Sequence, residues 1–133
     1  MNVIIICGGR EVKDIAALRE QAQAYIERRV HPSTLIMTGG ARGTDALVNR
    51  IALEMGRQPI IIPANWEGHS SRRIAGYERN KLMLTIAQAI ANQLGGKVKV
   101  VAFPGDKGTP MMVQLAHDSH VPYETIGWTF SPR

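Results

Sequence analysis

Three short apolar segments, each followed at once by glycine, constrain the fold of this 133-residue chain more than any other feature. The pairs of segment and loop are 3–7 with 8–10, 34–38 with 39–45, and 98–102 with 103–109. A helical pattern follows each loop. In an open parallel sheet such strand-to-helix loops lie at the carboxyl edge, where ligands of these folds bind. The pattern therefore predicts an α/β fold with a ligand site at that edge.

Strand-like and helix-like patterns alternate along the whole sequence, which is typical of parallel α/β proteins. The strands are predicted at 3–7, 34–38, 58–62, 98–102 and 121–126, and the helices at 15–30, 46–55, 72–94 and 110–117. Right-handed crossovers then predict a Rossmann-like open parallel sheet of about five strands in the order 3-2-1-4-5, with helices on both faces. This order makes the three glycine loops neighbours. We interpret residues 1–133 as one domain.

The loop 103–109 has the composition of a phosphate-binding turn. Gly105 and Gly108 are expected to adopt backbone angles that other residues avoid and to let the main chain approach a ligand. Thr109 suits an N-cap and Pro110 a first helical position. The unpaired N–H groups at such a helix start favour an anion, above all phosphate.

Asp45 has two interpretations. At the start of the second predicted helix, Thr44 or Asp45 is positioned to act as the N-cap. As a site residue, Asp45 would accept hydrogen bonds from ribose hydroxyls or act as a base. Both interpretations stay open, with the site role preferred.

Composition narrows the class of partner. A single cysteine excludes a disulfide framework, and no apolar run approaches the ~20 residues of a membrane span, so we expect a cytoplasmic protein without membrane contact. The net charge of +5 favours an anionic partner. Scattered basic residues and an aromatic content of 5% favour a nucleotide-type small molecule over single-stranded nucleic acid, which is the weaker alternative. His117 and His120 have no evident cysteine or carboxylate partner, so no metal and no cofactor is predicted.

Three further segments carry expectations. The polar loop 64–71 contains Trp66, which is predicted to lie near the ligand and to stack on a base. The long helix 72–94 is predicted to bury one stripe and to bend or restart at Gly76. That stripe comprises Ile74, Met83, Ile86, Ala87, Ile90 and Leu94. The tail from Gly127 onward is expected to be weakly ordered.

Together these motifs resemble the SLOG superfamily, and within it the branch related to YspA and YpsA. The matching motifs are Gly8-Gly9-Arg10 with Asp14, Gly39-Gly40-Ala41-x-Gly43-x-Asp45, Ala64-x-Trp66, Ala75-Gly76-x-x-Arg79-Asn80-x-x-Met83 and Phe103-Pro104-Gly105-x-x-Gly108-Thr109. They cover residues 3 to about 123. The resemblance implies a Rossmann-like fold and a nucleotide or nucleotide-derived ligand. Relatives include the LOG phosphoribohydrolases, the DprA/Smf proteins that handle single-stranded DNA, and sensor domains for ADP-ribose-type nucleotide signals.

The chain departs from the LOG pattern at two positions. LOG enzymes carry Pro-Gly-Gly-x-Gly-Thr-x-x-Glu and an arginine on the preceding helix, which Arg79 matches. Asp106 replaces the second glycine and Met112 the glutamate. Cleavage of a glycosidic bond normally needs a carboxylate near the anomeric carbon, and a thioether does not ionise. Asp45 and Asp106 are the acids that would have to substitute.

The sequence therefore predicts the binding of a nucleotide or an ADP-ribose-like derivative, for sensing or sequestration. The predicted ligand-binding residues are Gly8, Gly9, Arg10, Gly39, Gly40, Ala41, Gly43, Asp45, Trp66, Arg79, Asn80, Pro104, Gly105, Asp106, Gly108 and Thr109. One alternative is a LOG-type N-glycosidase that releases the base of nucleoside monophosphates, with Arg79, Asp45 and Asp106 as candidate catalytic residues. A DprA-like binder of single-stranded nucleic acid is the third. The resemblance also suggests a homo-oligomer.

Overall fold

The structure is a computed structural model that describes residues 1–65, 67 and 71–133. The predicted role of Trp66 falls outside the described residues. Its elements, in chain order, are β1 (Val3–Cys7), α1 (Ile15–Arg29), β2 (Leu35–Thr38), α2 (Thr44–Glu54), β3 (Ile60–Ile61), α3 (Arg72–Gln93), β4 (Val98–Ala102), α4 (Gly108–Asp118) and β5 (Tyr123–Thr125).

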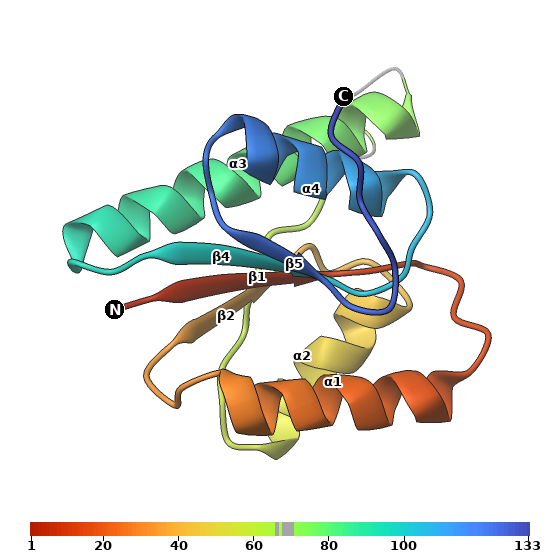
Figure 1. The fold of residues 1–133 in the computed structure, drawn as a ribbon, viewed down its shortest axis with the longest axis vertical. Coiled ribbons are helices and arrows are strands. Elements are labelled where there is room, and N and C mark those ends of the chain that lie inside the picture. Colours follow the sequence, from red (N-terminus) through yellow and green to blue (C-terminus); the bar gives the residue numbers. More distant parts are fainter. Residues whose placement is uncertain (66, 68–70) are drawn as a thin grey trace.

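The five strands form one parallel sheet in the order β3-β2-β1-β4-β5, which confirms the predicted Rossmann-like arrangement. Helices α1 and α2 cover one face and α3 and α4 the other (Figure 1). The central strand β1 lies between β2 and β4, with Ile5 opposite Met37 on one side and Val100 on the other. The loops after β1, β2 and β4 therefore open at the same edge of the sheet.

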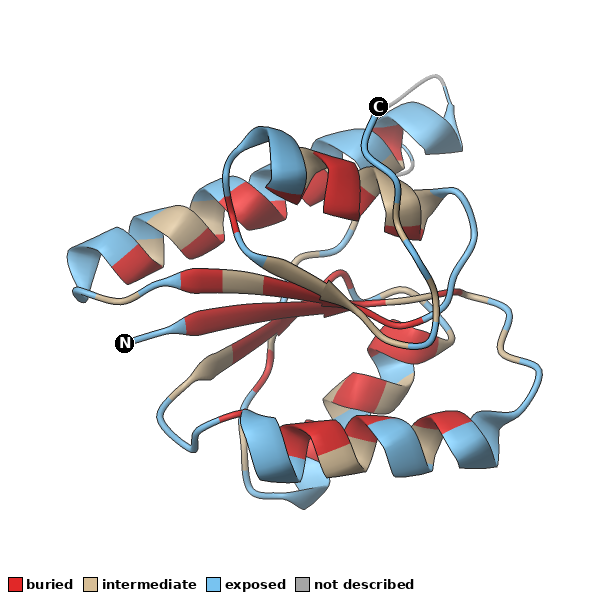
Figure 2. Cartoon of the chain, in the orientation of Figure 1, coloured by how far each residue is buried: buried red, intermediate tan, exposed pale blue. Residues whose placement is uncertain are grey.

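The sheet separates two apolar cores. All five residues of β1 are buried, and their side chains alternate between the faces, as expected of a strand covered on both sides. Ile4 and Ile6 pack with α1 and α2, and Ile5 with α3 and α4 (Figure 2). Among the described residues, no helix is both long and apolar enough to cross a membrane.

Several predicted boundaries shift at the edges of the sheet. The third strand is only Ile60–Ile61 instead of 58–62. Pro59 has no N–H to donate to β2, which explains the late start. The last strand shortens to Tyr123–Thr125. At the start of α1, Asp14 is the N-cap and accepts a hydrogen bond of 3.0 Å from the amide of Ala17.

The predicted inner stripe of the third helix was partly wrong. Met83 and Ala87 are buried, whereas Ile74 is 45% exposed and Leu94 is 51% exposed. Nine residues separate Ile74 from Met83, which at 3.6 residues per turn places them on opposite sides of the helix. Leu94 is the C-cap residue and lies beyond the packed turns. Gly76 is continuous with the helix and does not restart it.

The tail after Gly127 is packed against the molecule, contrary to expectation. The indole Nε1 of Trp128 donates to the carbonyl of Ala102 at 3.0 Å, and Thr125 Oγ1 donates to the Trp128 carbonyl at 2.7 Å. Phe130 meets the ring of Tyr123 edge to face, with 5.6 Å between ring centroids. These aromatic contacts order the segment, because they bury apolar surface that a loose tail would expose.

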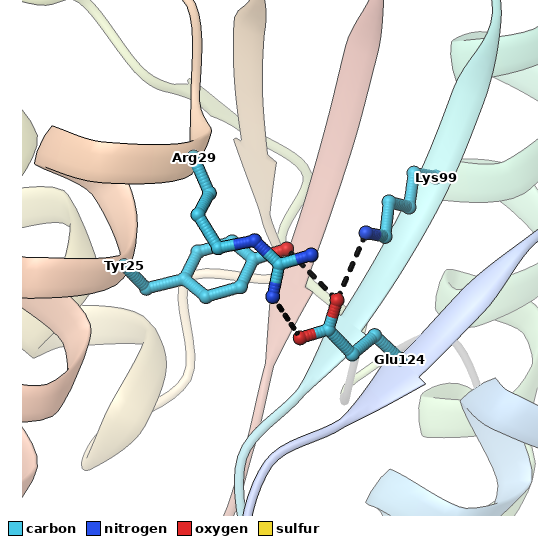
Figure 3. Close-up of polar contacts among 4 residues, drawn as sticks. All are labelled: Tyr25, Arg29, Lys99 and Glu124. Atoms are coloured by element: carbon cyan, nitrogen blue, oxygen red, sulfur yellow. Dashed lines mark hydrogen bonds and ion pairs between the residues drawn. The ribbon is translucent and has the colours of Figure 1, made fainter.

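Edge strand β5 is tied across the sheet to α1 by one carboxylate (Figure 3). Glu124 accepts hydrogen bonds from Arg29 at 2.6 Å, from Lys99 at 3.0 Å and from the Tyr25 hydroxyl at 3.5 Å. Burial raises the pKa of Glu124, but the bonds from Lys99 and Arg29 outweigh it and leave the pKa below its ordinary value. This cluster lies on the α1 face.

Candidate functional site

The three glycine loops meet at Gly9. Its N–H donates to the carbonyl of Pro104 at 2.9 Å, and its carbonyl accepts from both the amide and the hydroxyl of Thr44 at 3.0 Å. One residue of the first loop therefore joins the second and fourth strand ends. This pairing uses the hydrogen-bonding groups of Gly9 within the protein and holds the loops at fixed spacing.

Glycine is required at some loop positions and not at others. Gly43 has a φ of +81°, and a side chain there would meet the carbonyl of Gly9. Neither Gly105 nor Gly108 has positive φ, so the predicted special backbone angles were wrong for both. Gly105 is restricted by space instead, because a Cβ would lie 2.8 Å from the amide nitrogen of Gly9. Gly108 is open, with Asp106 Oδ1 at 3.8 Å as the contact of such a Cβ.

Helix α4 begins two residues earlier than predicted. Gly108 is its first residue and Lys107 occupies the cap position, so Thr109 is not the N-cap and Pro110 is not the first helical residue. The Asp106 carboxylate accepts from the Gly108 amide at 3.2 Å and stabilises this start. Thr109 is only 3% exposed, because its side chain packs into the space that Gly105 leaves.

Asp45 lies in the first turn of α2 and is not its cap, which is Gly43. The side chain is 5% exposed, and its Oδ2 accepts from the amide of Ala41 at 3.1 Å. The other oxygen, Oδ1, is buried and has no hydrogen-bond partner among the described residues. A buried carboxylate oxygen without a donor is costly, so its presence here points to a partner from outside the chain.

Arg79 lies on α3 and faces the ends of β1 and β2. Its Nη1 donates to the carbonyl of Gly39 at 2.7 Å, and its Nε to the side-chain oxygen of Asn80 at 3.0 Å. A side chain on Gly39 would occupy the position of the Arg79 guanidinium. Asn80, itself 5% exposed, also donates to the carbonyl of Gly108 at 3.4 Å. Asn80 thus connects the arginine to the start of α4.

These groups line a cleft of about 840 Å³ between the sheet edge, α3 and α4. Of the predicted site residues, the structure brings nine to its wall: Gly8, Arg10, Ala41, Asp45, Arg79, Asn80, Asp106, Gly108 and Thr109. Gly39, Gly40 and Gly43 do not line it. Gly9, Pro104 and Gly105 line a second hollow of about 480 Å³ beside α1. The cleft surface therefore does not include Gly9, Gly39, Gly40, Gly43 or Gly105, which shape the loops.

The cleft is electropositive around one buried acid. Six arginine or lysine residues and two aspartates line it. Burial raises the pKa of Asp45 to about 6, although the amides of Ala41 and Gly39 and the charges of Arg79 and Arg10 act in the opposite direction. Burial also lowers the pKa of Arg79, against the attraction of Asp45. Cys7 is buried, and burial raises its pKa and keeps it a thiol.

Sequence reasoning missed several residues of the cleft wall. They are Cys7, Arg72, Arg73, Gly76, Met83, Lys107, Pro110, Met111, Met112, Gln114, Ser131 and Arg133. For α3 a signal existed: Arg72, Gly76, Arg79 and Met83 repeat at intervals of four, three and four, the spacing of one helix face. No comparable signal marks Ser131 and Arg133, which reach the cleft only because the tail folds back.

A family model described as the YspA, cpYpsA-related SLOG family matches residues 2–69, about half of the chain. The chain belongs to this SLOG family. The match confirms the resemblance found in the sequence. No curated protein matches the chain at a significant level.

Within this SLOG protein, the family match and the cleft overlap only in part. The matched segment supplies the first two strand ends, including Arg10 and Asp45. Arg79, the start of α4 and the tail lie outside it. Family membership supports a nucleotide-related role in general terms. The more specific proposal of a ligand site rests on the individual cleft residues.

Proposed function

We propose that this protein binds a nucleotide or a nucleotide-derived ligand in the cleft between α3, α4 and the sheet edge, as a sensor or a sequestering protein. The observation that carries the proposal is the buried Oδ1 of Asp45, which has no donor among the described residues and belongs to a residue that lines an electropositive cleft. Ribose hydroxyls are donors of the required kind, and phosphate provides the anion that the surrounding cations favour.

The chemistry of the cleft suggests which end of the ligand goes where. A phosphate is favoured at the start of α4, where the helix dipole is positive and where Arg79 and Lys107 line the cleft. It is disfavoured beside loop 39–45, because the ionised Asp45 would repel it. We therefore assign the phosphate to Arg79 and the α4 start, and the ribose hydroxyls to Asp45.

A second candidate function, cleavage of the ribose–base bond, is favoured by one observation. A carboxyl with a pKa of about 6 exchanges protons near neutral pH, as a general acid or base must. Against it, Met112 at the LOG glutamate position is 1% exposed and packs in the apolar core. Both Asp106 and Asp45 accept a backbone hydrogen bond, but Asp106 is exposed and Asp45 is buried. Asp45 is therefore the acid we would assign to such a reaction.

Three measurements on the wild-type protein test the proposal. Calorimetric titration with AMP, GMP, CMP and UMP should detect binding of at least one, and mass spectrometry of the denatured protein should find a nucleotide-type molecule that co-purifies. Chromatographic assay of the same four nucleotides should show no release of free base above a buffer blank. Turnover that disappears in Asp45→Asn would instead support the hydrolase. Absence of any nucleotide binding, together with salt-sensitive binding of oligonucleotides, would contradict both.

A further inference from the structure

The opening of the cleft is built from two segments that are far apart in the sequence. The tail after Gly127 turns back, crosses α4 and ends near the first turn of α3 (Figure 1). Ser131 and Arg133 of the tail and Arg72 and Arg73 of α3 all line the cleft. The backbone N–H of Arg133 donates to Gln114 Oε1 of α4 at 3.0 Å, so the tail is attached at its far end as well as at Trp128.

The cations at this opening have no acidic partner among the residues that the structure describes. Ion pairs between described residues are Arg19–Glu54, Arg29–Glu124, Arg42–Glu11, Lys81–Glu78 and Lys99–Glu124. None of these pairs involves Arg72, Arg73 or Arg133. Arg72, Arg73 and Arg133 are exposed and bring three positive charges to one end of the cleft. Their mutual repulsion is relieved when an anion binds between them.

This opening is a different position from the one at Arg79. Arg72 precedes Arg79 by seven residues, which places it on the same helix face and about 10 Å away along the axis. Between them lies Gly76, where an added Cβ would meet nothing within 4 Å. The absence of a side chain at Gly76 keeps the cleft continuous from Arg79 to the opening.

The same cleft contains the donor-less Oδ1 of Asp45, which is an independent sign that a ligand completes it. A nucleoside monophosphate offers one phosphate, which the Arg79 position would take. The three cations at the opening would then remain without a counter-charge. A ligand with a second anionic group would neutralise both positions.

We propose that Arg72, Arg73 and Arg133 form a second anion-binding position, at the opening of the cleft, for a further phosphate or comparable anionic group of the ligand whose first phosphate lies at Arg79. The proposal rests on the proposed nucleotide-binding function. The tail positions Arg133, with Trp128 and Gln114 as its attachments. The protein is therefore selective for ligands with more than one anionic group.

Calorimetric titration with AMP and ADP tests this selectivity. Wild-type protein should bind ADP about tenfold more tightly than AMP, as expected for added charge-assisted contacts. The double variant Arg72→Gln/Arg73→Gln should lose most of that preference and keep its AMP affinity within about twofold. Arg133→Gln should lose part of it. All three side chains are exposed, so these variants should melt at the wild-type temperature.

The matched control is Arg28→Gln/Arg50→Gln, which removes the same charge from exposed positions outside the cleft wall. It should retain the full preference for ADP. Equal affinities of wild type for AMP and ADP, or an unchanged preference in the Arg72/Arg73 double variant, would overturn the second position and leave the proposed function intact. Failure of wild type to bind either nucleotide would count against the proposed function itself and this inference with it.

Discussion

Two carboxylates lie beside cations, Glu124 on the α1 face of the sheet and Asp45 at the carboxyl edge, yet their pKa values shift in opposite directions. Glu124 keeps 24% of its side chain exposed and accepts bonds from Arg29, Lys99 and Tyr25, which lower its pKa. Asp45 is 5% exposed, one of its oxygens has no partner among the described residues, and its pKa rises to about 6.

The difference separates a structural group from a group that awaits a ligand. Glu124 holds β5 and β4 to α1, and its hydrogen-bonding capacity is used by the protein. At Asp45 the effect of burial on the pKa outweighs the backbone amides and the charges of Arg79 and Arg10. The folded chain therefore carries a carboxyl group that is costly to ionise. Such a group persists at a site where a ligand relieves it. Variants of each region should therefore affect different properties.

A third carboxylate, introduced at a side chain that is almost fully buried, should have the largest effect. Met112 is 1% exposed in the apolar core, so Met112→Glu should lower the free energy of unfolding by more than about 3 kcal/mol or prevent folding. Met112→Leu, the volume-matched control, should cost less than about 1.5 kcal/mol. Urea denaturation measures both. A stable Met112→Glu protein would show that this position reaches the cleft water.

Blocking the cleft should remove binding without loss of stability. Gly76 lines the cleft, has no positive φ, and leaves open space around its missing Cβ. Gly76→Leu should weaken nucleotide binding by about 100-fold or more, since it fills the path between Arg72 and Arg79. Gly76→Ala should add about 0.5–1 kcal/mol of stability through helix propensity. Calorimetry measures the affinity of Gly76→Leu, and thermal melts measure the stability of Gly76→Ala. Wild-type affinity in Gly76→Leu would show that the ligand does not bind in this cleft.

Asp45→Asn should stabilise the protein and weaken its binding. Because the pKa is about 6 when folded and near 3.9 when unfolded, the folded state holds an extra proton between these values. Wild-type stability should therefore fall as pH rises from about 4 to about 6. At pH 8 the asparagine variant should be more stable, on the order of 1–3 kcal/mol, and this gain should vanish below pH 4. A loss of stability at pH 8 would show that Oδ1 of Asp45 also has a partner within the fold.

Glu124→Gln should change stability less than Asp45→Asn and with the opposite sign. Its ion pairs are partly exposed, so the variant should lose about 1–2 kcal/mol at pH 7. Since the pKa is lowered in the folded state, this stabilisation is present above the unfolded value near 4.3 and is lost as pH falls through the folded value. Nucleotide affinity should stay at the wild-type level. A binding defect here would mean that the two regions are coupled.

The sheet order and the position of the site were predictable because they follow from topology. Alternating strands and helices, together with right-handed crossovers, leave few arrangements, and glycine loops after β1, β2 and β4 converge in the one observed. Asp45 stood out as a charged residue in a predicted sheet-edge loop, and Arg79 through the motif that it shares with the SLOG proteins. The identity of the ligand stays a prediction.

The details that were mispredicted depend on contacts between distant segments. The loop glycine Gly105 resembles a residue with special backbone angles, yet its constraint is the amide of Gly9. The order of the tail depends on Trp128 reaching Ala102, 26 residues earlier. Such pairings leave no periodic signal in one sequence.

The central claim is that the ligand site lies on the α3 side of the sheet edge. Titration of AMP into the variants Arg79→Ala and Arg29→Ala tests this claim most directly. Both variants remove one arginine that contacts an oxygen of the protein, Gly39 O in one case and Glu124 in the other. We predict that Arg79→Ala loses about 1.5–3 kcal/mol of binding free energy, as for a charge-assisted bond, while Arg29→Ala binds as wild type does. Wild-type AMP affinity in Arg79→Ala, or equal losses in both variants, would contradict the account.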